Sequence, residues 1–246
     1  MIDIKNWREL QDDITTDALW ISSESTKNRP MFKIPKRDFL HENDKNFHGL
    51  FIAEIPYQFI KRFLPEGGLI WDCFGGSGTT YNVASYLGER CILTDLNPKR
   101  DFIQYGDAVN YTLTEKADLI FCHPPYHDIV KYSDNPLDGS NQKDIDGFLD
   151  WLENVAINVS KNIKPGGVCI LVLGNLYMNG EEKTLGVWGK DRFCKHGFIC
   201  KSHIIKDYGE TKGTEGKNYN LNYVRQLRGG YNNFYGDNIF ILKYKK

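Results

Sequence analysis

The chain has 246 residues, a formal net charge of −1 and a hydrophobic share of 41%. This length suits one α/β domain with a full core, or one domain with a small appendage. The near-neutral charge argues against a protein built mainly to coat nucleic acid, and no apolar run approaches the ~20 residues that cross a bilayer. The first residues, MIDIKNWRELQDD, lack the apolar core of a secretion signal, so we expect a cytoplasmic protein with no membrane partner.

The six cysteines form no Cys-x-x-Cys pair. Four of them lie in or beside predicted strands, where a reduced thiol packs as a small apolar residue. Cys194 and Cys200 flank His196, but two or three ligands at that spacing are weak evidence for zinc. We therefore expect buried free thiols and no bound metal.

Residues 1–47 differ in pattern from the rest of the chain. An amphipathic helix is expected over 6–20, whereas 22–46 is polar, turn-rich and without a clear period. We interpret 1–47 as an N-terminal arm and 48–246 as the main domain.

Beyond the arm, apolar runs alternate with helical segments. The helices are predicted over 54–64, 79–87 and 146–163, and Gly88 and Lys164-Pro165-Gly166-Gly167 end two of them. The strands are predicted over 69–72, 91–95, 118–122, 168–174, 198–205 and 238–244, with a weaker run near 102–105. This alternation predicts a mostly parallel sheet with helices on both faces, which binds ligands at the carboxyl ends of its strands.

The first of these strands runs into a glycine-rich turn, Leu69-Ile70-Trp71-Asp72-Cys73-Phe74-Gly75-Gly76-Ser77-Gly78-Thr79-Thr80. Clustered glycines bring backbone close to a ligand, and the following helix presents free N–H groups. A phosphate-binding P-loop fails because Thr79 stands where lysine is required. A dinucleotide fingerprint is poor because Tyr81 stands where the third glycine is required. A nucleoside cofactor with its amino-acid end over the glycines remains, and a turn without a ligand is the alternative.

Two downstream acids fit a nucleoside. Asp95 ends the second strand, 23 residues after Asp72, and a carboxylate there accepts both hydroxyls of a ribose. Asp107 is placed to accept from an adenine amino group. Alternatively, either acid is a turn residue that caps a helix.

A second apolar run ends in His123-Pro124-Pro125-Tyr126. Consecutive prolines leave carbonyls without matching N–H donors and hold them in fixed directions. Such carbonyls accept the hydrogens of a conjugated amine, turn its lone pair toward a methyl donor and stabilise the developing positive charge. Tyr126 offers a face for a base pulled out of a duplex, although a rigid turn with a packed tyrosine is the alternative. The expected acceptor is an amino nitrogen, since no Pro-Cys dipeptide for attack on a pyrimidine ring carbon is present.

The C-terminal part is basic and rich in tyrosine. From residue 201 onward there are nine Lys and Arg against four Asp and Glu, so this part is expected to dock a polyanion. The basic residues of this part include Lys212, Lys217, Arg225 and Arg228, and a solvated surface loop is the alternative interpretation.

Both motifs resemble those of the amino-methylating DNA methyltransferases, which use S-adenosylmethionine. The family pattern Asp-Pro-Phe-x-Gly-Ser-Gly-Thr-Thr is matched over 72–80, with Cys73 in place of proline. The pattern (Asp/Asn/Ser)-Pro-Pro-(Tyr/Trp/Phe) is matched at 124–126, with His123 in the first position. The similarity covers roughly residues 47–205. It implies a Rossmann-like class I methyltransferase fold, with a seven-stranded, mostly parallel sheet and an antiparallel last strand.

The resemblance also implies a segment that recognises the target. The first candidate for such an insertion is 206–236, and the loop 127–145 is the second. The DNA-binding residues expected in 206–236 are Lys212, Lys217, Arg225 and Arg228.

Motifs and resemblance together give two sets of site residues. The cofactor-binding set is Asp72, Phe74, Gly75, Gly76, Gly78, Thr79, Asp95 and Asp107. The catalytic set is His123, Pro124, Pro125 and Tyr126. A neutral His123 accepts one hydrogen bond from an amine and a protonated one does not, so activity is expected to fall on acidification.

We therefore expect an S-adenosylmethionine-dependent, site-specific DNA methyltransferase that acts on N6 of adenine or N4 of cytosine. Its partner is double-stranded DNA with a flipped target base, and a homodimer and a cognate restriction nuclease are further partners left open. The alternatives are methylation of RNA or of a protein glutamine, and a cofactor-binding regulatory module without catalysis. The target base and the recognition sequence do not follow from the sequence.

Overall fold

The computed structural model describes residues 18–21, 52–207, 224, 226–230 and 236–246. Its elements are β1 (Leu19–Ile21), α1 (Glu54–Phe63), β2 (Leu69–Asp72), α2 (Thr79–Leu87), β3 (Arg90–Asp95), β4 (Ile103–Tyr105), β5 (Ala117–Cys122), the 3-10 helices η3 (His127–Ile129) and η4 (Gly139–Asn141), α3 (Ile145–Asn162), β6 (Ile163–Gly174), β7 (Leu176–Met178), β8 (Glu181–Lys183), α4 (Leu185–Lys195), β9 (Phe198–Asp207) and β10 (Gly236–Tyr244).

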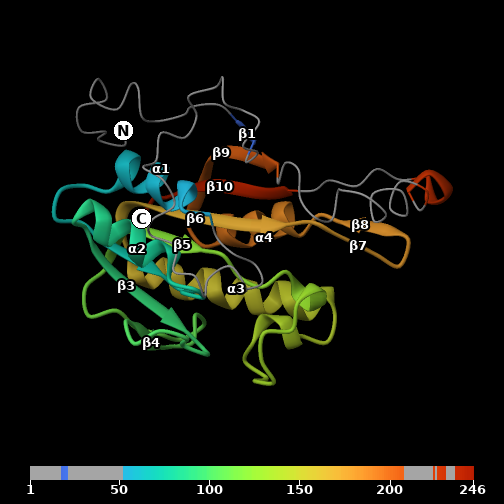
Figure 1. Cartoon of the computed structure of the whole chain (residues 1–246), viewed down its shortest axis with the longest axis horizontal. Coiled ribbons are helices and arrows are strands. Elements are labelled where there is room, and N and C mark those ends of the chain that lie inside the picture. Colours follow the sequence, from blue (N-terminus) through green and yellow to red (C-terminus); the bar gives the residue numbers. More distant parts are fainter. Residues whose placement is uncertain (1–17, 22–51, 208–223, 225, 231–235) are drawn as a thin grey trace.

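An eight-stranded sheet with the order β1-β9-β10-β6-β5-β2-β3-β4 forms the centre of the molecule (Figure 1). Strand β10 is antiparallel to both of its neighbours, β6 and β9, and the other neighbouring strands are parallel. Without the edge strand β1, this is the predicted seven-stranded sheet with an antiparallel last strand, and that prediction is confirmed.

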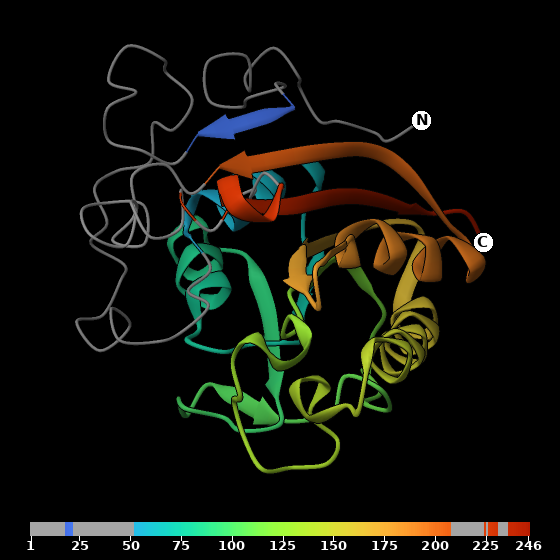
Figure 2. The same ribbon diagram turned by 90° about the vertical axis from the view of Figure 1, so that its right-hand side faces the viewer.

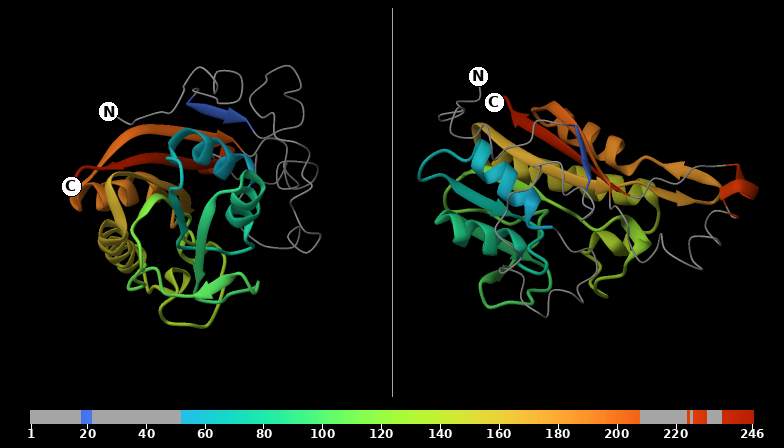
Figure 3. Two further views of the ribbon diagram at one scale, coloured as in Figure 1. Left: turned by 90° about the vertical axis from the view of Figure 1, so that its left-hand side faces the viewer. Right: turned by 45° about the horizontal axis from the view of Figure 1, so that its top comes forward.

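Helices cover both faces of the sheet, with α1 and α2 on one side and α3 and α4 on the other (Figures 2 and 3). Because successive side chains of a strand point to opposite faces, β6 contributes to both cores. Ile170 packs in the cluster that holds Phe59 of α1, and Leu171 packs in the cluster that holds Phe148 of α3. All four side chains are buried, so the sheet is apolar on both faces, as parallel sheets between helix layers are.

The expected helix over 6–20 is wrong at its end, since Leu19 and Trp20 belong to the short strand β1, which pairs with β9 in parallel register. The rest of that helix lies outside the described residues. A three-residue strand depends on the edge of β9 for its hydrogen bonds, and a local apolar pattern carries no information about such a partner.

Helix α4 and the β7–β8 hairpin were not predicted from the sequence. For α4 the reason is its glycine content. Its sequence contains Gly186 and Gly189, which disfavour a helix. Both glycines are required by close packing: a Cβ at Gly186 would lie 2.7 Å from Asn238 Nδ2, and one at Gly189 would lie 2.9 Å from Leu152 Cδ2. Tertiary packing therefore overrides local propensity here.

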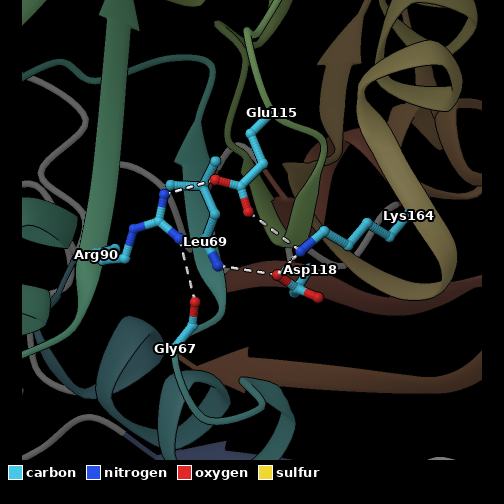
Figure 4. Close-up of polar contacts among 6 residues, drawn as sticks. All are labelled: Gly67, Leu69, Arg90, Glu115, Asp118 and Lys164. Carbon is cyan, nitrogen blue, oxygen red and sulfur yellow. Dashed lines mark hydrogen bonds and ion pairs between the residues drawn. The ribbon is translucent and has the colours of Figure 1, made fainter.

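Charged side chains join the amino ends of the strands, at the edge of the sheet opposite the carboxyl ends (Figure 4). Asp118 Oδ2 accepts from the Leu69 backbone N–H at 2.9 Å and from Lys164 Nζ at 2.8 Å. Glu115 accepts from Arg90 Nη2 at 2.6 Å. The network links β2, β3, β5 and β6 at their starts and leaves their other ends for ligands.

The six cysteines lie within the described residues and are all free thiols, as expected, but the expected burial holds for only three of them. Cys73, Cys122 and Cys169 are buried, whereas Cys200 is exposed. Among the described residues, no helix has the length and apolar character to span a membrane.

Candidate active site

The carboxyl ends of β2, β3 and β5 open into one cavity of about 480 Å³. Of the predicted cofactor set, Gly78 alone does not line it; it is the N-cap of α2. The predicted residues that do line the cavity are Asp72, Phe74, Gly75, Gly76, Thr79, Asp95, Asp107, His123, Pro124, Pro125 and Tyr126. The fold thus brings the glycine loop and the Pro-Pro-Tyr loop together across a shared space.

Asp72 fixes the shape of the glycine loop. The carboxylate is buried at the end of β2, and its Oδ1 accepts from the Phe74 backbone N–H at 3.0 Å. Its Oδ2 accepts from the Thr80 hydroxyl at 2.5 Å. The two bonds tie the start of the loop to the first turn of α2, so the backbone between them is held in one conformation.

Two of the glycines have backbone angles that other residues rarely adopt. Gly76 has φ 49° and Gly78 has φ 91°. A Cβ at Gly78 would also lie 2.7 Å from Cε2 of Phe102. These glycines are needed because a side chain would strain the turn or displace the ring beneath it.

Asp95 and Asp107 each combine a turn contact with a place on the cavity wall. Asp95 Oδ2 accepts from Gly76 N at 2.9 Å and its Oδ1 from Asn97 N at 2.8 Å, which ties the end of β3 to the glycine loop. Asp107 Oδ1 accepts from Val109 N at 2.9 Å. A carboxylate has roughly four acceptor sites, so these contacts leave capacity for a ligand. The turn role and the ligand role are therefore compatible.

The Pro-Pro-Tyr loop is held by its tyrosine. The Tyr126 hydroxyl donates to Asp237 Oδ1 at 2.6 Å and lies 2.9 Å from His123 Nε2. Its ring packs against Gly174, where a Cβ would lie 2.6 Å from Tyr126 Cε2. Asp237 and Gly174 lie on neighbouring strands, paired in the β10–β6 register. The tyrosine is thus anchored to the sheet at both its hydroxyl and its ring.

Sequence reasoning missed Asp237 and its partner Lys206. Both are buried, and Lys206 Nζ donates to Asp237 Oδ2 at 3.1 Å. They face each other across the β9–β10 pairing. The signal available in the sequence was an acid at the start of the last strand, which also fits an ordinary turn.

The segment between the Pro-Pro-Tyr loop and α3 forms another wall of the cavity, with Val130, Tyr132 and Ser133 among the lining residues. Asp138 holds this segment together: its Oδ1 accepts from Ser140 N at 2.9 Å, and its Oδ2 accepts from the Ser133 hydroxyl at 2.8 Å. This segment is most of the loop 127–145 that was the second candidate for target recognition.

The basic residues predicted to bind DNA are only partly described. Lys212, Lys217 and Arg225 lie outside the described residues. Arg228 lies in a short helical stretch and is exposed. Its role in binding stays a prediction.

Burial shifts two titrations in opposite directions. Desolvation raises the pKa of Asp72 from 3.8 to about 6, against the hydrogen bonds from Thr80 and Phe74, and the negative charge of Asp95 adds to the rise. Desolvation lowers the pKa of His123 from 6.5 to about 4; the Lys206 ammonium adds to this effect and the Asp237 carboxylate opposes it. At neutral pH the imidazole is therefore neutral and Asp72 is mostly ionised.

The two shifts have opposite consequences for stability. The contribution of Asp72 is fully present below about pH 3.8 and is lost as the pH rises through about 6. That of His123 is fully present above about pH 6.5 and is lost as the pH falls toward about 4. Between these limits the two contributions partly cancel, so single substitutions are needed to reveal them.

The sheet order, with one antiparallel strand, and the cavity at the strand ends are those of the class I methyltransferase fold. TrmN from Thermus thermophilus has the same fold, with a TM-score of 0.50 and 16% identity, over 85% of this chain and 52% of TrmN. Other solved structures that match less well include a second Thermus thermophilus protein, provisionally described as a DNA modification methylase (TM-score 0.38, 20% identity, 57% of this chain and 51% of that one). A TehB-like SAM-dependent methyltransferase from Corynebacterium glutamicum has a TM-score of 0.44 and 17% identity, over 78% of this chain and 87% of that one. The chain spans about half the length of the first two proteins.

A family model of the N6/N4 methyltransferase type, described as DNA methylase, matches residues 3–101. The resemblance to amino-methylating DNA methyltransferases is thereby confirmed. The matched range contains the glycine loop and Asp95 and ends before His123. It therefore supports the predicted cofactor loop and does not extend to the Pro-Pro-Tyr loop. No curated protein matches the chain.

Replacing Asp72 with asparagine should remove the pH-dependent cost of burying its charge. Wild-type protein should lose about 1 kcal/mol of unfolding free energy relative to Asp72→Asn between pH 5 and pH 7, because a pKa near 6 titrates in this range. Urea unfolding at several pH values measures the difference. Asp146→Asn, at an exposed acid of α3, controls for the loss of one negative charge. Parallel curves for wild type and Asp72→Asn would contradict the assignment.

Proposed function

We propose that the protein transfers a methyl group from S-adenosylmethionine to the exocyclic amino nitrogen of adenine (N6) or cytosine (N4) in DNA. The observation that carries the proposal is that the glycine loop and the Pro-Pro-Tyr loop line the same cavity. A methyl donor and an amine held at these two loops meet without any movement of the sheet. The volume of about 480 Å³ falls within the range of small-molecule sites.

The glycine side of the cavity fits the cofactor by the chemistry of its donors and acceptors. Asp95 and Asp107 keep acceptor capacity for ribose hydroxyls and for an adenine amino group. Gly75 and Gly76 line the cavity with backbone alone, which suits the close approach of the amino-acid end. When bound, the cofactor would supply an electrophilic methyl group on a positively charged sulfur: the amine nitrogen forms a bond to the methyl carbon as the carbon–sulfur bond breaks, the thioether leaves, and the nitrogen then loses one proton to water.

The other side of the cavity suits a conjugated amine. Pro124 and Pro125 line it, and proline carbonyls held in fixed directions accept amine hydrogens and stabilise the positive charge that develops on nitrogen. His123 lies at the head of this loop and its neutral ring keeps one acceptor nitrogen. Tyr126 is fixed by Asp237 and Gly174, so a base that stacks on it meets a preorganised ring.

DNA is the proposed substrate because the matched family is that of DNA methylases and because the C-terminal part is basic. Region 206–236 is proposed to contact the duplex, and residues 1–47 to serve as an arm beside the domain 48–246. RNA, a protein glutamine and a binding module without catalysis are the alternatives that the next experiment separates.

Incubation with methyl-labelled cofactor and unmethylated duplex DNA should place label on N6 of adenine or N4 of cytosine. Digestion to nucleosides followed by mass spectrometry identifies the base, with parallel incubations on single-stranded DNA, RNA and protein. Asp95→Ala should lower the rate roughly tenfold or more, since about 1.4 kcal/mol of cofactor binding is a factor of ten. Lys164→Met, which breaks an ion pair at the opposite edge of the sheet, is the control. Label confined to RNA or protein, or absent everywhere, would overturn the proposal.

The rate of methyl transfer should depend on a neutral His123. With its pKa lowered to about 4, acidification from pH 7 should leave the imidazole neutral until about pH 5 and protonate it below that. The measurement is the ratio of the single-turnover rate of wild type to that of His123→Asn at each pH. The effect of Asp72 titration cancels in this ratio, because both proteins contain Asp72. The ratio should be constant above about pH 5 and fall below it. A variant that keeps the full rate and the same pH profile would exclude this role.

An added methyl group at Gly174 should reduce turnover by displacing Tyr126. The Cβ would lie 2.6 Å from the ring, so Gly174→Ala should lower kcat roughly tenfold and cost ~1–3 kcal/mol of stability through overpacking. Gly167→Ala is the matched control, because it lies on the same strand and its Cβ would overpack against Ile163 at the opposite edge of the sheet. Equal activity of the two variants per folded molecule would show that the position of Tyr126 is unimportant.

Charge reversal at Arg225 and Arg228 should weaken duplex binding and flatten its dependence on salt. Removing one protein–phosphate ion pair lowers the slope of log affinity against log salt by about 1. Fluorescence anisotropy at several salt concentrations measures this slope. Lys161→Glu is the control, since this exposed residue ends α3 beside the start of β6, at the other edge of the sheet. Unchanged affinity would place recognition elsewhere, with the loop 127–145 next.

A further inference from the structure

The hydrogen bonds beneath the Pro-Pro-Tyr loop form a chain from a buried ion pair to His123. Lys206 Nζ donates to Asp237 Oδ2 at 3.1 Å, the Tyr126 hydroxyl donates to Asp237 Oδ1 at 2.6 Å, and the same hydroxyl lies 2.9 Å from His123 Nε2. The function proposed above uses Asp237 only to fix Tyr126 and gives no role to Lys206.

The direction of each bond in this chain follows from the number of hydrogens available. A carboxylate only accepts, so the single hydroxyl hydrogen of Tyr126 is committed to Asp237. The Tyr126 oxygen therefore has no hydrogen left for His123 and must accept from it. The hydrogen in the His123–Tyr126 bond then belongs to Nε2.

We infer that Lys206 and Asp237 are positioning residues which, acting through the Tyr126 hydroxyl, hold His123 in the tautomer with its proton on Nε2. In a neutral imidazole the lone pair then resides on Nδ1. The tautomer decides which ring nitrogen accepts a hydrogen from the target amine, and this consequence for catalysis rests on the proposed function. The assignment of the tautomer does not rest on the proposed function, because it follows from the hydrogen bonds alone.

Burial makes the arrangement specific. Lys206 and Asp237 are each 5% exposed, so neither exchanges its partner for bulk water. Asp237 is paired in register with Lys206 on one side and with Gly174 on the other, and Gly174 contacts the Tyr126 ring. Three strands thus fix the carboxylate, the ammonium and the ring relative to one another. The lowered pKa of His123 agrees with a neutral ring that has one proton to place.

The ion pair is not explained by stability alone. A buried ion pair is often no more stabilising than apolar residues of similar size, whereas it orients its neighbours strongly. An apolar pair at these positions would remove the carboxylate that accepts from the Tyr126 hydroxyl. The hydroxyl would then be able to donate to His123, and the imidazole proton would move to Nδ1.

The tautomer can be measured on the full chain without cofactor or substrate. Long-range proton–nitrogen NMR spectra of protein labelled with ¹⁵N-histidine at pH 7 distinguish the protonated ring nitrogen, and His123→Gln assigns the signals. Wild type should show the Nε2-protonated form. Tyr126→Phe, which leaves the ion pair in place, and the apolar Lys206→Met/Asp237→Leu double variant, which removes the acceptor of the Tyr126 hydroxyl, should each lower that population. A wild-type Nδ1-protonated ring, or one unchanged tautomer in both variants, would overturn the inference.

Kinetics test the catalytic consequence separately. The double variant should lower kcat roughly tenfold and leave KM for the cofactor unchanged, because Asp95 and the glycine loop are not touched. Lys164→Met removes an ion pair from the opposite edge of the same sheet and should change neither the tautomer nor kcat. A full kcat in the double variant would refute the catalytic role. If no acceptor is methylated by wild type, the proposed function fails while the NMR result still decides the tautomer.

Discussion

The parallel pairing of β2 with both β3 and β5 sets three strand ends side by side, and the site is built from the residues that follow them. Asp72, Asp95 and His123 stand at or just after these ends. The buried Asp72 carboxylate fixes the glycine loop at the end of β2, the middle one of these three strands. Burial of this carboxylate costs desolvation free energy, which is why its pKa is raised. Ligand binding at this edge of the sheet is therefore a consequence of strand order.

The antiparallel strand β10 completes the site in a different way. The parallel strands end at the cavity, so the residues at their carboxyl ends line it. Strand β10 runs the opposite way and begins there, with Asp237 close enough to accept from the Tyr126 hydroxyl. Strand β9 ends beside it with Lys206. The reversal of one strand thus places an ion pair beneath the Pro-Pro-Tyr loop, at the two ends of the region 206–236 that is proposed to contact DNA.

Local pattern was sufficient for most of the sheet and for α1, α2 and α3, because these elements have strong apolar periodicity and clear breakers. Six of the eight predicted cofactor residues are neighbours in one loop, and Asp95 and Asp107 lie at or just after the ends of the next two strands. Asp237 could not be found in this way, since its role depends on register with Gly174 and Lys206, far away in the sequence. The glycines of α4 were misleading for a related reason. They are required by close contacts with Asn238 and Leu152, which are distant in the sequence.

The donor and the acceptor are supported by different observations. The family match covers the glycine loop, and the geometry of the cavity connects that loop to the Pro-Pro-Tyr loop. The proposed function requires first that the glycine loop is the cofactor site, which calorimetric titration with S-adenosylhomocysteine tests directly. It predicts one site per chain, with affinity at least tenfold weaker in Asp95→Ala and unchanged in Tyr126→Phe. An absence of binding, or binding that Asp95→Ala leaves intact, would contradict it.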